Sequence, residues 1–483
     1  MVQQFIELDD LGILESPEEV LSTLNRDGSR RWMYPVPAKG RHWRQRLWVG
    51  WALIAFFVLL PIVPINGRPA VFLNVMDREF ALFGGVFYPT DTLLLLILGV
   101  ASMVAIVLLT ALLGRVWCGW ACPQTVYLEF VYRPIERWIE GKEHIRKRRN
   151  EGPWTFDKVW RKGVKLVLFT LISAFLAHTF VAYFAGWENL LAWMQRPPNE
   201  QWGFFILMGG TTGLMLFNFG YFREQMCTIT CPYARFQSVL LDPDSLIVSY
   251  DPVRGEPRAR RSKKKLRQEA EGLIPAQGDC IDCGACVRTC PTGIDIRDGL
   301  QMECIACTQC IDACDAIMDK IGLEPGLIRY TSERELEGKR TRRVRPRTML
   351  YGALMTALVV AFVALLATQG TYEIHVGRAV GEPFMALPDG RIANRLQFRV
   401  HNQSSTPVTF TLEAVQPLGT QINVVGPPET ELEALEMGRV EAWIMVTPET
   451  FGEADTQEAQ FRLHFSDGTQ HDVTFPLLGP SQR

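Results

Sequence analysis

Twelve cysteines are the residues of this chain whose type and spacing point most directly to chemistry. Eight of them form two copies of one pattern, C-x-x-C-x-x-C-x-x-x-C. The first copy is Cys280, Cys283, Cys286 and Cys290, and the second is Cys304, Cys307, Cys310 and Cys314. Three cysteines with this spacing wrap a tight loop around one face of an iron–sulfur cubane, while the fourth reaches the other cluster of a pair.

The two copies therefore predict two [4Fe-4S] clusters with interleaved ligands. Cys280, Cys283, Cys286 and Cys314 are expected to hold one cluster, and Cys304, Cys307, Cys310 and Cys290 the other. Zinc also binds C-x-x-C pairs, but it does not require the additional cysteines in both copies. The second copy has Asp315 where the first has Pro291, and its spacing is otherwise intact.

The other four cysteines form a second repeat, C-x-x-x-C-P, and we call its two copies the elbows. The first elbow is residues 118–123, with Cys118 and Cys122, and the second is residues 227–232, with Cys227 and Cys231. In a helix, the two cysteines of each elbow would share one face. Such thiolates suit Cu(I), zinc or a further iron–sulfur cluster. The alternative is four structural cysteines that pack as small apolar residues, and we favour a metal or redox role.

Five apolar segments precede or follow these motifs and must position them. They are residues 47–65, 92–113, 165–185, 203–222 and 349–368, and apart from Lys165 they contain no Lys, Arg, Asp or Glu. Each is close to the roughly 20 residues that cross a bilayer. Residues 1–46 are polar and carry their basic residues before the first apolar run, so we expect no cleavable signal peptide and a retained first anchor.

The distribution of Lys and Arg predicts the orientation of these spans. Segments 1–47, 114–165 and 223–347 contain 7, 12 and 21 of them, whereas segments 66–90, 186–202 and 371–483 contain 2, 1 and 7. By the positive-inside rule, the N-terminus and all twelve cysteines are cytoplasmic and the C-terminal segment is periplasmic. A reducing compartment keeps cysteines free to bind metal. The net charge of -2 indicates no particular partner.

After Thr371 the pattern changes to alternating apolar and polar residues. Clear examples are residues 396–400, 408–412, 440–444 and 461–465, and Asp389-Gly390 and Asp467-Gly468 are turn motifs. About seven short strands predict an immunoglobulin-like sandwich. The 15 Asp and Glu against 7 Arg in this segment could suit a cationic partner, but we favour a solvated surface.

Together these patterns predict an α-helical membrane protein with five transmembrane helices. An inserted 2[4Fe-4S] ferredoxin-like α+β domain and a C-terminal all-β Ig-like sandwich complete the predicted fold class. The expected domains are a cytoplasmic N-terminal segment (1–46), a four-helix membrane domain (47–222), a cytoplasmic domain (223–347) with the ferredoxin module at 272–322, a fifth transmembrane helix (348–369) and a periplasmic Ig-like domain (371–483).

Two further features each have a functional and a structural interpretation. His178 lies inside the third apolar segment, where an ionisable residue suggests a haem or quinone site. We favour a neutral histidine that bonds a neighbouring helix. The basic run Arg258–Arg267 is expected to contact anionic lipid on the cytoplasmic face rather than nucleic acid.

Several motifs resemble those of known families. Residues 117–125, Trp-Cys-Gly-Trp-Ala-Cys-Pro-Gln-Thr, resemble the elbow of polyferredoxin-like membrane proteins such as the NapH-type quinol dehydrogenases. Residues 231–237, Tyr250-Asp251, residues 254–258, both cluster motifs, the fifth apolar segment and the β-rich tail narrow the resemblance. From about residue 30 to 480 the chain resembles the CcoG/FixG/RdxA family of cytochrome c oxidase accessory proteins.

This resemblance implies a role in assembling a cbb3-type oxidase in the bacterial inner membrane, through reduction of Cu(II) to Cu(I). The elbow residues Cys118, Cys122, Cys227 and Cys231 carry over as the copper site, and the other eight cysteines as cluster ligands. Expected partners are oxidase assembly factors, copper chaperones, an unidentified electron donor, the membrane and a second copy of the chain in a homodimer. The alternatives are a quinol-linked electron-transfer subunit and a non-enzymatic copper chaperone or assembly factor.

Overall fold

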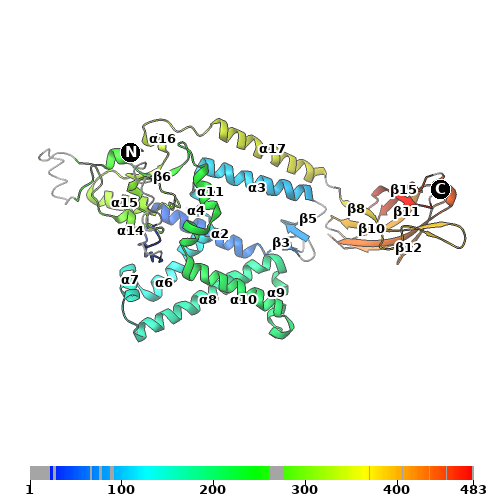
Figure 1. Cartoon of the computed structure of the whole chain (residues 1–483), viewed down its shortest axis with the longest axis horizontal. Coiled ribbons are helices and arrows are strands. Elements are labelled where there is room, and N and C mark those ends of the chain that lie inside the picture. The colour runs from blue at the N-terminus through cyan, green and yellow to red at the C-terminus, as the bar shows by residue number, and fades with distance from the viewer. Residues whose placement is uncertain are drawn as a thin grey trace, which may run out of the picture. The chain divides into compact units, whose positions relative to one another are not determined.

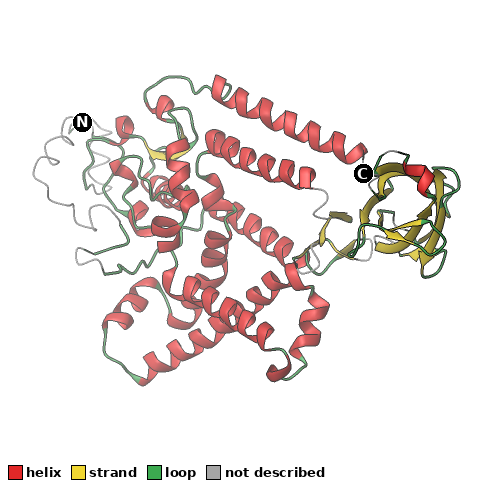
Figure 2. Cartoon of the chain, turned by 45° about the vertical axis from the view of Figure 1, so that its right-hand side comes forward, coloured by secondary structure: helices red, strands yellow, loops and turns green. Residues whose placement is uncertain are grey.

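The computed structural model describes residues 22–25, 29–65, 68–75, 79–87, 92–260, 273, 277–368, 370–404, 406–433, 436–452 and 454–480. The chain divides into two compact units, one of Met1–Phe83 with Tyr88–Phe362 and one of Gly84–Phe87 with Val363–Arg483. The first unit is mainly helical and the second consists mainly of strands, drawn red and yellow in Figure 2.

Long helices dominate the first unit. They are α2 (Arg41–Leu59), α3 (Thr92–Leu113), α8 (Phe156–Ala185), α10 (Trp202–Phe217), which the π-helical turn η5 (Asn218–Phe222) extends, and α17 (Pro346–Thr368). Helices α8 and α10 pack along each other (Figure 1). Four described segments are long and apolar enough to cross a membrane: Leu93–Leu113, Phe156–Ala185, Trp202–Phe222 and Pro346–Ala367. They coincide with the last four predicted spans.

The first predicted span has different bounds in the structure. Helix α2 begins at Arg41 and ends at Leu59, and the chain then turns into strand β1 (Pro64–Ile65), which pairs with β2 (Arg68–Pro69). Proline cannot donate the helical hydrogen bond, so Pro61 and Pro64 account for this early end. The 19 residues of α2 extend about 28 Å, close to the roughly 30 Å of a bilayer core. The bounds 47–65 were therefore wrong, and a fifth crossing stays a prediction.

Short helices connect the long ones. Between α3 and α8 lie α4 (Val116–Trp120), α5 (Pro123–Tyr127), the π-helical turn η3 (Leu128–Tyr132), α6 (Arg133–Glu140) and α7 (Glu143–Glu151). Between α8 and α10 lie α9 (Trp187–Met194) and η4 (Pro198–Glu200), and η5 is followed by η6 (Met226–Thr230) and α11 (Pro232–Leu240). Strands β3 (Val71–Asn74) and β4 (Glu79–Leu82) form an antiparallel pair.

The cysteine-rich module spans residues 247–331. Strand β6 (Ile247–Tyr250) pairs antiparallel with β7 (Ile328–Thr331), and between them lie α12 (Pro252–Gly255), α14 (Ala285–Thr289), η7 (Ile296–Asp298) and α15 (Gln309–Ile321). Helix α16 (Glu333–Leu336) follows. Both strands lie outside the predicted bounds 272–322. All four residues of β6 are buried, and so short a run without alternation does not identify a strand from sequence.

The second unit is a sandwich of two antiparallel sheets. One sheet has the order β12-β14-β10-β8, with β9 paired to β10, and the other has the order β13-β11-β15-β16. The strands are β8 (Tyr372–Arg378), β9 (Met385–Ala386), β10 (Ile392–Asn402), β11 (Val408–Gln416), β12 (Gln421–Val425), β13 (Thr430–Leu432), β14 (Met437–Val446), β15 (Thr456–Phe465) and β16 (Gln470–Leu478). Strand β5 (Gly85–Phe87) belongs to neither of these sheets. Buried Phe398 and Ile444 of one sheet pack with Phe461 of the other, which confirms the predicted sandwich.

Candidate metal centre

Two cavities in the cysteine-rich module are each ringed by four cysteines. The first is lined by Cys280, Cys283, Cys286 and Cys314, and the second by Cys290, Cys304, Cys307 and Cys310, with Cys286 also on its edge. These are the two predicted sets. Within the described residues, no three His, Cys, Asp or Glu side chains are close enough to hold a single ion. The rings therefore fit a larger group, such as a cubane, better than one metal ion.

The backbone of the two cysteine loops repeats as closely as their sequences do. Asp282 and Ala306, each just before the second cysteine of its loop, both have φ of 50°. Gly284 and Thr308, each just after it, have φ of 64° and 61°. Such left-handed residues within a turn can direct successive N–H groups toward one centre, which favours an anionic group. The two loops are thus shaped for the same kind of anion.

Burial sets the chemistry of the cluster-facing thiols. It raises the pKa of Cys286 and Cys304 to about 11, and the pKa of Cys307 to about 12. One arginine opposes burial at each position: Arg297 at Cys286, Arg115 at Cys304 and Arg46 at Cys307. A buried thiolate needs such positive charge, and the iron of a cluster would supply more of it.

Arg46 supports the fit of an anionic cluster in the second cavity. The residue is fully buried, and its Nε donates to the Gly119 carbonyl oxygen at 2.9 Å. Its Nη1 and Nη2 have no hydrogen-bond partner among the described residues. Burying a guanidinium with two unsatisfied nitrogens is costly unless a counter-charge is present. A cluster held by Cys307 and its partners would supply that charge, since Arg46 acts electrostatically on Cys307.

The elbows are broken helices, which corrects one expectation. Cys118 lies in α4 and Cys227 in η6, but Cys122 and Cys231 have extended backbones with ψ of 125° and 110°. A new helix then starts at the following proline, in α5 and in α11. Proline disfavours helical geometry in the residue before it. The expectation that both cysteines of an elbow share one helical face is therefore wrong.

The four elbow thiols nevertheless lie near one another, although no three of them are close enough in this structure to hold one metal ion. Burial, together with the nearby Cys122, Cys118 and Cys231, raises the pKa of Cys227 to about 12. The two repeats also interlock. The Cys118 thiol donates to Gln237 Oε1 of α11 at 3.0 Å, and Gln124 Nε2 of α5 donates to the Arg223 carbonyl oxygen at 2.8 Å. Each post-elbow helix is thus tied to the other repeat.

The first elbow lies directly against the second cysteine loop. A Cβ on Gly119 would stand 2.6 Å from the Ile305 carbonyl oxygen and 2.8 Å from the Ala306 carbonyl carbon. Cys118, Ile305 and Cys307 form one buried cluster, against which Cys227 packs. No cysteine pattern could reveal this contact, and the only hint in the sequence is the small residue that follows Cys118.

Two aromatic residues and an arginine reinforce the contact. Trp120 Nε1 donates to the Tyr330 hydroxyl at 2.9 Å, and that hydroxyl lies 3.4 Å from the Ala306 carbonyl oxygen, to which it donates. Arg115 donates to the Met302 carbonyl oxygen on the same loop. The side chains of Arg115, Trp120 and Tyr330 therefore hold the second cysteine loop in place.

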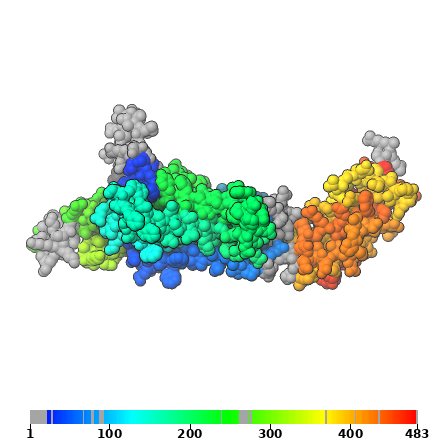
Figure 3. All heavy atoms as spheres, turned by 90° about the horizontal axis from the view of Figure 1, so that it is seen from below, coloured from blue at the N-terminus to red at the C-terminus, as the bar shows by residue number. Residues whose placement is uncertain are grey.

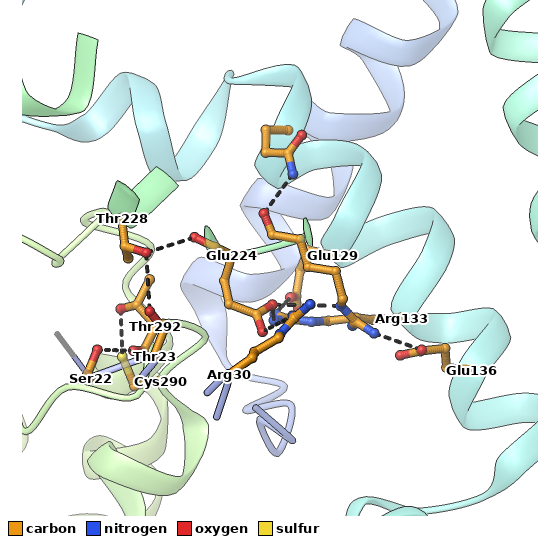
Figure 4. Close-up of polar contacts among 12 residues, drawn as sticks. Ser22, Thr23, Arg30, Glu129, Arg133, Glu136, Glu224, Thr228, Cys290 and Thr292 are labelled. Atoms are coloured by element: carbon orange, nitrogen blue, oxygen red, sulfur yellow. Dashed lines mark hydrogen bonds and ion pairs between the residues drawn. The ribbon is translucent and has the colours of Figure 1, made fainter. Parts of the chain in front are cut away.

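A buried network of charged side chains joins the cysteine-rich module to η3 and α6 (Figure 4). Arg133 pairs with Glu129 at 2.7 Å, and Gln309 Nε2, next to Cys310, donates to Glu129 Oε1 at 3.0 Å. Burial alone would raise the pKa of Glu129, but Arg133 and Arg46 outweigh it, so this pKa is lowered. Glu129 is therefore an anion that anchors the start of α15.

The N-terminal segment joins the same network. Arg30 pairs with Glu224 at 2.9 Å, and Ser22 Oγ donates to the Thr292 carbonyl oxygen at 2.6 Å. The Thr292 hydroxyl lies 3.4 Å from Cys290 Sγ (Figure 4). The described part of the N-terminal segment thus contacts the loop that carries a predicted ligand of the second cluster.

Two predicted features lie elsewhere. His178 is half-buried, and its Nδ1 donates to the Ala174 carbonyl oxygen at 2.7 Å. This hydrogen bond lies within its own helix, whereas we had expected one to a neighbouring helix. Of the basic run Arg258–Arg267, only residues 258–260 are described, with Arg258 3.8 Å from both Glu256 and Asp298. The predicted lipid contact of this run lies mostly outside the described residues.

Three regions of the chain match known protein families. Residues 222–333 match a 4Fe-4S dicluster domain, and residues 95–146, which include the first elbow, match a 4Fe-4S binding domain. Residues 362–477 match the IG-like fold at the C-terminal of FixG. Two iron–sulfur matches, one of them outside the cysteine-rich module, support iron–sulfur chemistry in the first unit.

Similar proteins cover most of the chain. Protein RdxA of Cereibacter sphaeroides is 33% identical over 82% of this chain and 84% of its own length, and protein RdxB of the same organism is 32% identical over 86% and 88%. Nitrogen fixation protein FixG of Rhizobium meliloti is 37% identical over 63% of this chain and 57% of its own length. A FixG-related protein structure from Vibrio parahaemolyticus aligns with 24% of this chain and 100% of its own, at 14% identity and a TM-score of 0.20.

Proposed function

The chain belongs to the family of FixG and RdxA, and on that premise we propose that this iron–sulfur electron-transfer protein reduces Cu(II) to Cu(I) at its elbow cysteines. The copper would serve assembly of a cbb3-type oxidase in the bacterial inner membrane. The observation that carries the proposal is the contact of the first elbow with the second cysteine loop. Gly119 meets Ile305 and Ala306 there without an intervening side chain.

The two cysteine rings would each hold one cluster, with the ligands predicted from the spacing. A [4Fe-4S] cluster supplies one-electron transfer when bound. Cys286 borders both cavities, so this residue bridges the two rings. From the second ring, Cys307 and Ile305 pack directly on Cys118. The chain therefore offers a continuous set of contacts from the first ring to the first elbow, through the buried residues Cys286, Cys307 and Cys118.

The elbow thiols suit copper as the substrate. Burial raises the pKa of Cys118 to about 11, so this sulfur becomes a thiolate only when a cation accompanies it. Soft thiolates favour Cu(I) over Cu(II), which makes reduction of bound copper easier. Each Cu(II) takes one electron, and each reduced cluster can provide one. In vitro, dithionite can supply those electrons before the copper is added.

The test removes one thiol from each elbow. The Cys118→Ser/Cys227→Ser variant would be reduced with dithionite, desalted and given Cu(II) together with a Cu(I) chelator. We expect Cu(I) formation to be abolished, while iron stays near eight per chain and the cluster spectrum is unchanged. The control is Trp117→Phe, beside Cys118 but half-exposed, which should behave as wild type. A double variant that reduces copper at the wild-type rate would remove the elbows from the proposal.

A second candidate is that the elbows hold a further iron–sulfur cluster. The match of residues 95–146 to a 4Fe-4S binding domain favours it, because that region contains only Cys118 and Cys122 of the twelve cysteines. This candidate predicts more than eight iron atoms per chain in the wild type and a loss of about four in the double variant. An unchanged count near eight would exclude it.

A further inference from the structure

A large cavity lies away from the clusters and the elbows, beside α6, α7 and the start of α8. Its volume is about 730 Å³, within the usual range for small-molecule sites. Residues of the N-terminal segment, seen in blue against the cyan surface of α6–α8, form one wall (Figure 3). Among the described residues, the lining contains eight cationic side chains: Arg30, Arg31, Arg146, Lys147, Lys158, Lys162, Lys165 and Arg223. Three carboxylates of the described residues line it: Glu136, Glu140 and Glu151.

Two of these cations are buried with unused donors. The side chains of Arg30 and Arg223 are 6% and 3% exposed. Arg30 uses Nη2 to bond Glu224, but its Nε and Nη1 have no hydrogen-bond partner among the described residues. Arg223 uses Nη1 to bond Glu136 at 2.8 Å, while its Nε and Nη2 likewise lack a hydrogen-bond partner in the described part of the chain. A ligand with several acceptor oxygens would satisfy these donors.

The carboxylates of the cavity do not balance its positive charge. Glu136 is already paired with Arg146 at 2.6 Å and with Arg223, and Glu140 with Lys165 at 2.9 Å. Lys158 Nζ instead donates to two neutral groups, the carbonyl oxygens of Asn150 at 3.1 Å and Gly152 at 2.7 Å. Its charge therefore has no counter-ion among these contacts. A dense group of cations around one cavity attracts an anion.

The places of the lining residues relative to the apolar segments indicate where the cavity lies with respect to a membrane. Lys158, Lys162 and Lys165 lie in the first turns of α8, before its apolar part, and Arg223 directly follows the apolar segment Trp202–Phe222. Trp32 and Trp154 also line the cavity and are exposed, as is usual for tryptophan at a membrane–water interface. This is the level of lipid headgroups.

We propose that this cavity binds a phosphate-bearing anion, and that the headgroup of an anionic phospholipid is the source its position favours. Guanidinium groups match phosphate oxygens in two parallel hydrogen bonds, and the adjacent Nε and Nη2 of Arg223, which lack a hydrogen-bond partner among the described residues, form such a pair of donors. The glycerol and acyl carbons adjoining a headgroup would then lie near Trp32 and Trp154. Residues 258–260, the described part of the basic run Arg258–Arg267, do not line the cavity.

The test compares two matched double variants of the full chain. Lys147→Gln/Lys162→Gln removes two cations of the cavity and leaves Arg30 and Arg223 in place. Arg148→Gln/Lys320→Gln removes two exposed cations that do not line it. Native mass spectrometry in detergent would measure binding of phosphatidylglycerol, with phosphatidylcholine, glycerol 3-phosphate and inorganic phosphate as separate probes. Iron content checks that each variant is folded.

We expect wild type and the control variant to bind phosphatidylglycerol at least about tenfold more tightly than the cavity variant, and more tightly than phosphatidylcholine. Binding of glycerol 3-phosphate or inorganic phosphate with the same loss in the cavity variant, but no preference for the lipid, would support the phosphate site and identify a soluble source. Equal lipid binding by both double variants, or no binding of any phosphate probe, would overturn the proposal. If the cavity variant loses iron, the test is instead whether increasing salt releases phosphatidylglycerol from the wild-type protein. Retention of the lipid at high salt would contradict the proposal.

Discussion

Gly119 approaches Ile305 so closely that a Cβ on the glycine would stand 2.6 Å from the Ile305 carbonyl oxygen. The contact joins the first elbow to the loop that carries Cys304 and Cys307, across a large separation in sequence. A backbone oxygen cannot swing aside as the end of a side chain can. The distance between the elbow and the second ring therefore depends on the absence of a side chain at Gly119.

The first prediction concerns this glycine. Gly119→Ala should push the second cysteine loop away from Cys118 at a cost of about 1–3 kcal/mol, as expected for overpacking. Cu(I) formation by the reduced protein should slow at least about tenfold, while iron content stays the same, because electron transfer depends on the elbow contact. The control is Gly99→Ala, where a Cβ would meet nothing within 4 Å. Wild-type copper reduction by Gly119→Ala would show that electrons do not pass through this contact.

The second prediction concerns the buried cation at the second ring. Arg46→Gln should lower the reduction potential of the second cluster by about 50–100 mV, since loss of one nearby positive charge costs the reduced form about 1–2 kcal/mol at an effective dielectric constant near 20. Arg46→Lys should restore most of the potential. Arg44→Gln, on the exposed side of the same helix, is the control. An EPR-monitored redox titration measures all three, and identical potentials would contradict the role of Arg46.

The third prediction concerns the joint between α2 and α15. The Asp312 carboxylate accepts from the backbone N–H of His42 at 3.1 Å and of Trp43 at 2.7 Å, and so caps the start of α2. Asp312→Ala should cost about 1–2 kcal/mol, as loss of a helix cap usually does. Hydrogen–deuterium exchange of residues 41–46 should accelerate accordingly. Asp319→Ala, exposed on the same α15, should leave exchange unchanged.

The fourth prediction concerns pH and the second unit. The Tyr372 hydroxyl donates to Asp467 Oδ2 at 2.6 Å, and burial together with this carboxylate raises the pKa of Tyr372 from 10.0 to about 12. A raised pKa stabilises the fold below pH 10, and that contribution is lost as the pH rises from 10 to 12. Strands β8 and β15 should therefore lose exchange protection over this range. Tyr372→Phe should remove this part of the pH dependence, and an unchanged profile in the variant would contradict it.

The fifth prediction concerns topology. With five crossings, a reporter fused after Arg483 should be active only if it works in the periplasm, and a reporter inserted after Asn150 only if it works in the cytoplasm. If α2 does not cross, both reporters should switch compartment or the N-terminus should be periplasmic. Activity of a strictly cytoplasmic reporter after Arg483 would overturn the five-span topology.

The sequence by itself determined those features that depend on neighbouring residues. The spacing of eight cysteines predicted two groups of four, and the structure gathers the same two groups around two cavities. Four apolar segments and the alternating strands of the second unit were also predicted, because helix length and strand alternation are local properties. The spacing of the elbow cysteines suggested one helical face, whereas in the structure a new helix starts at Pro123 and at Pro232 and the cysteine before each proline is extended.

Only the tertiary structure decided which distant segments meet. The contact of Gly119 with Ile305, the unsatisfied donors of Arg46 beside Cys307, and the cavity that joins the N-terminal segment to α6–α8 all arise between residues far apart in the chain. The free-energy cost of a buried charge, or of a Cβ added at Gly119, depends on which atoms the fold places opposite it. Composition and residue spacing do not show which surface packs opposite a given residue, so these three contacts can be seen only in the packed structure.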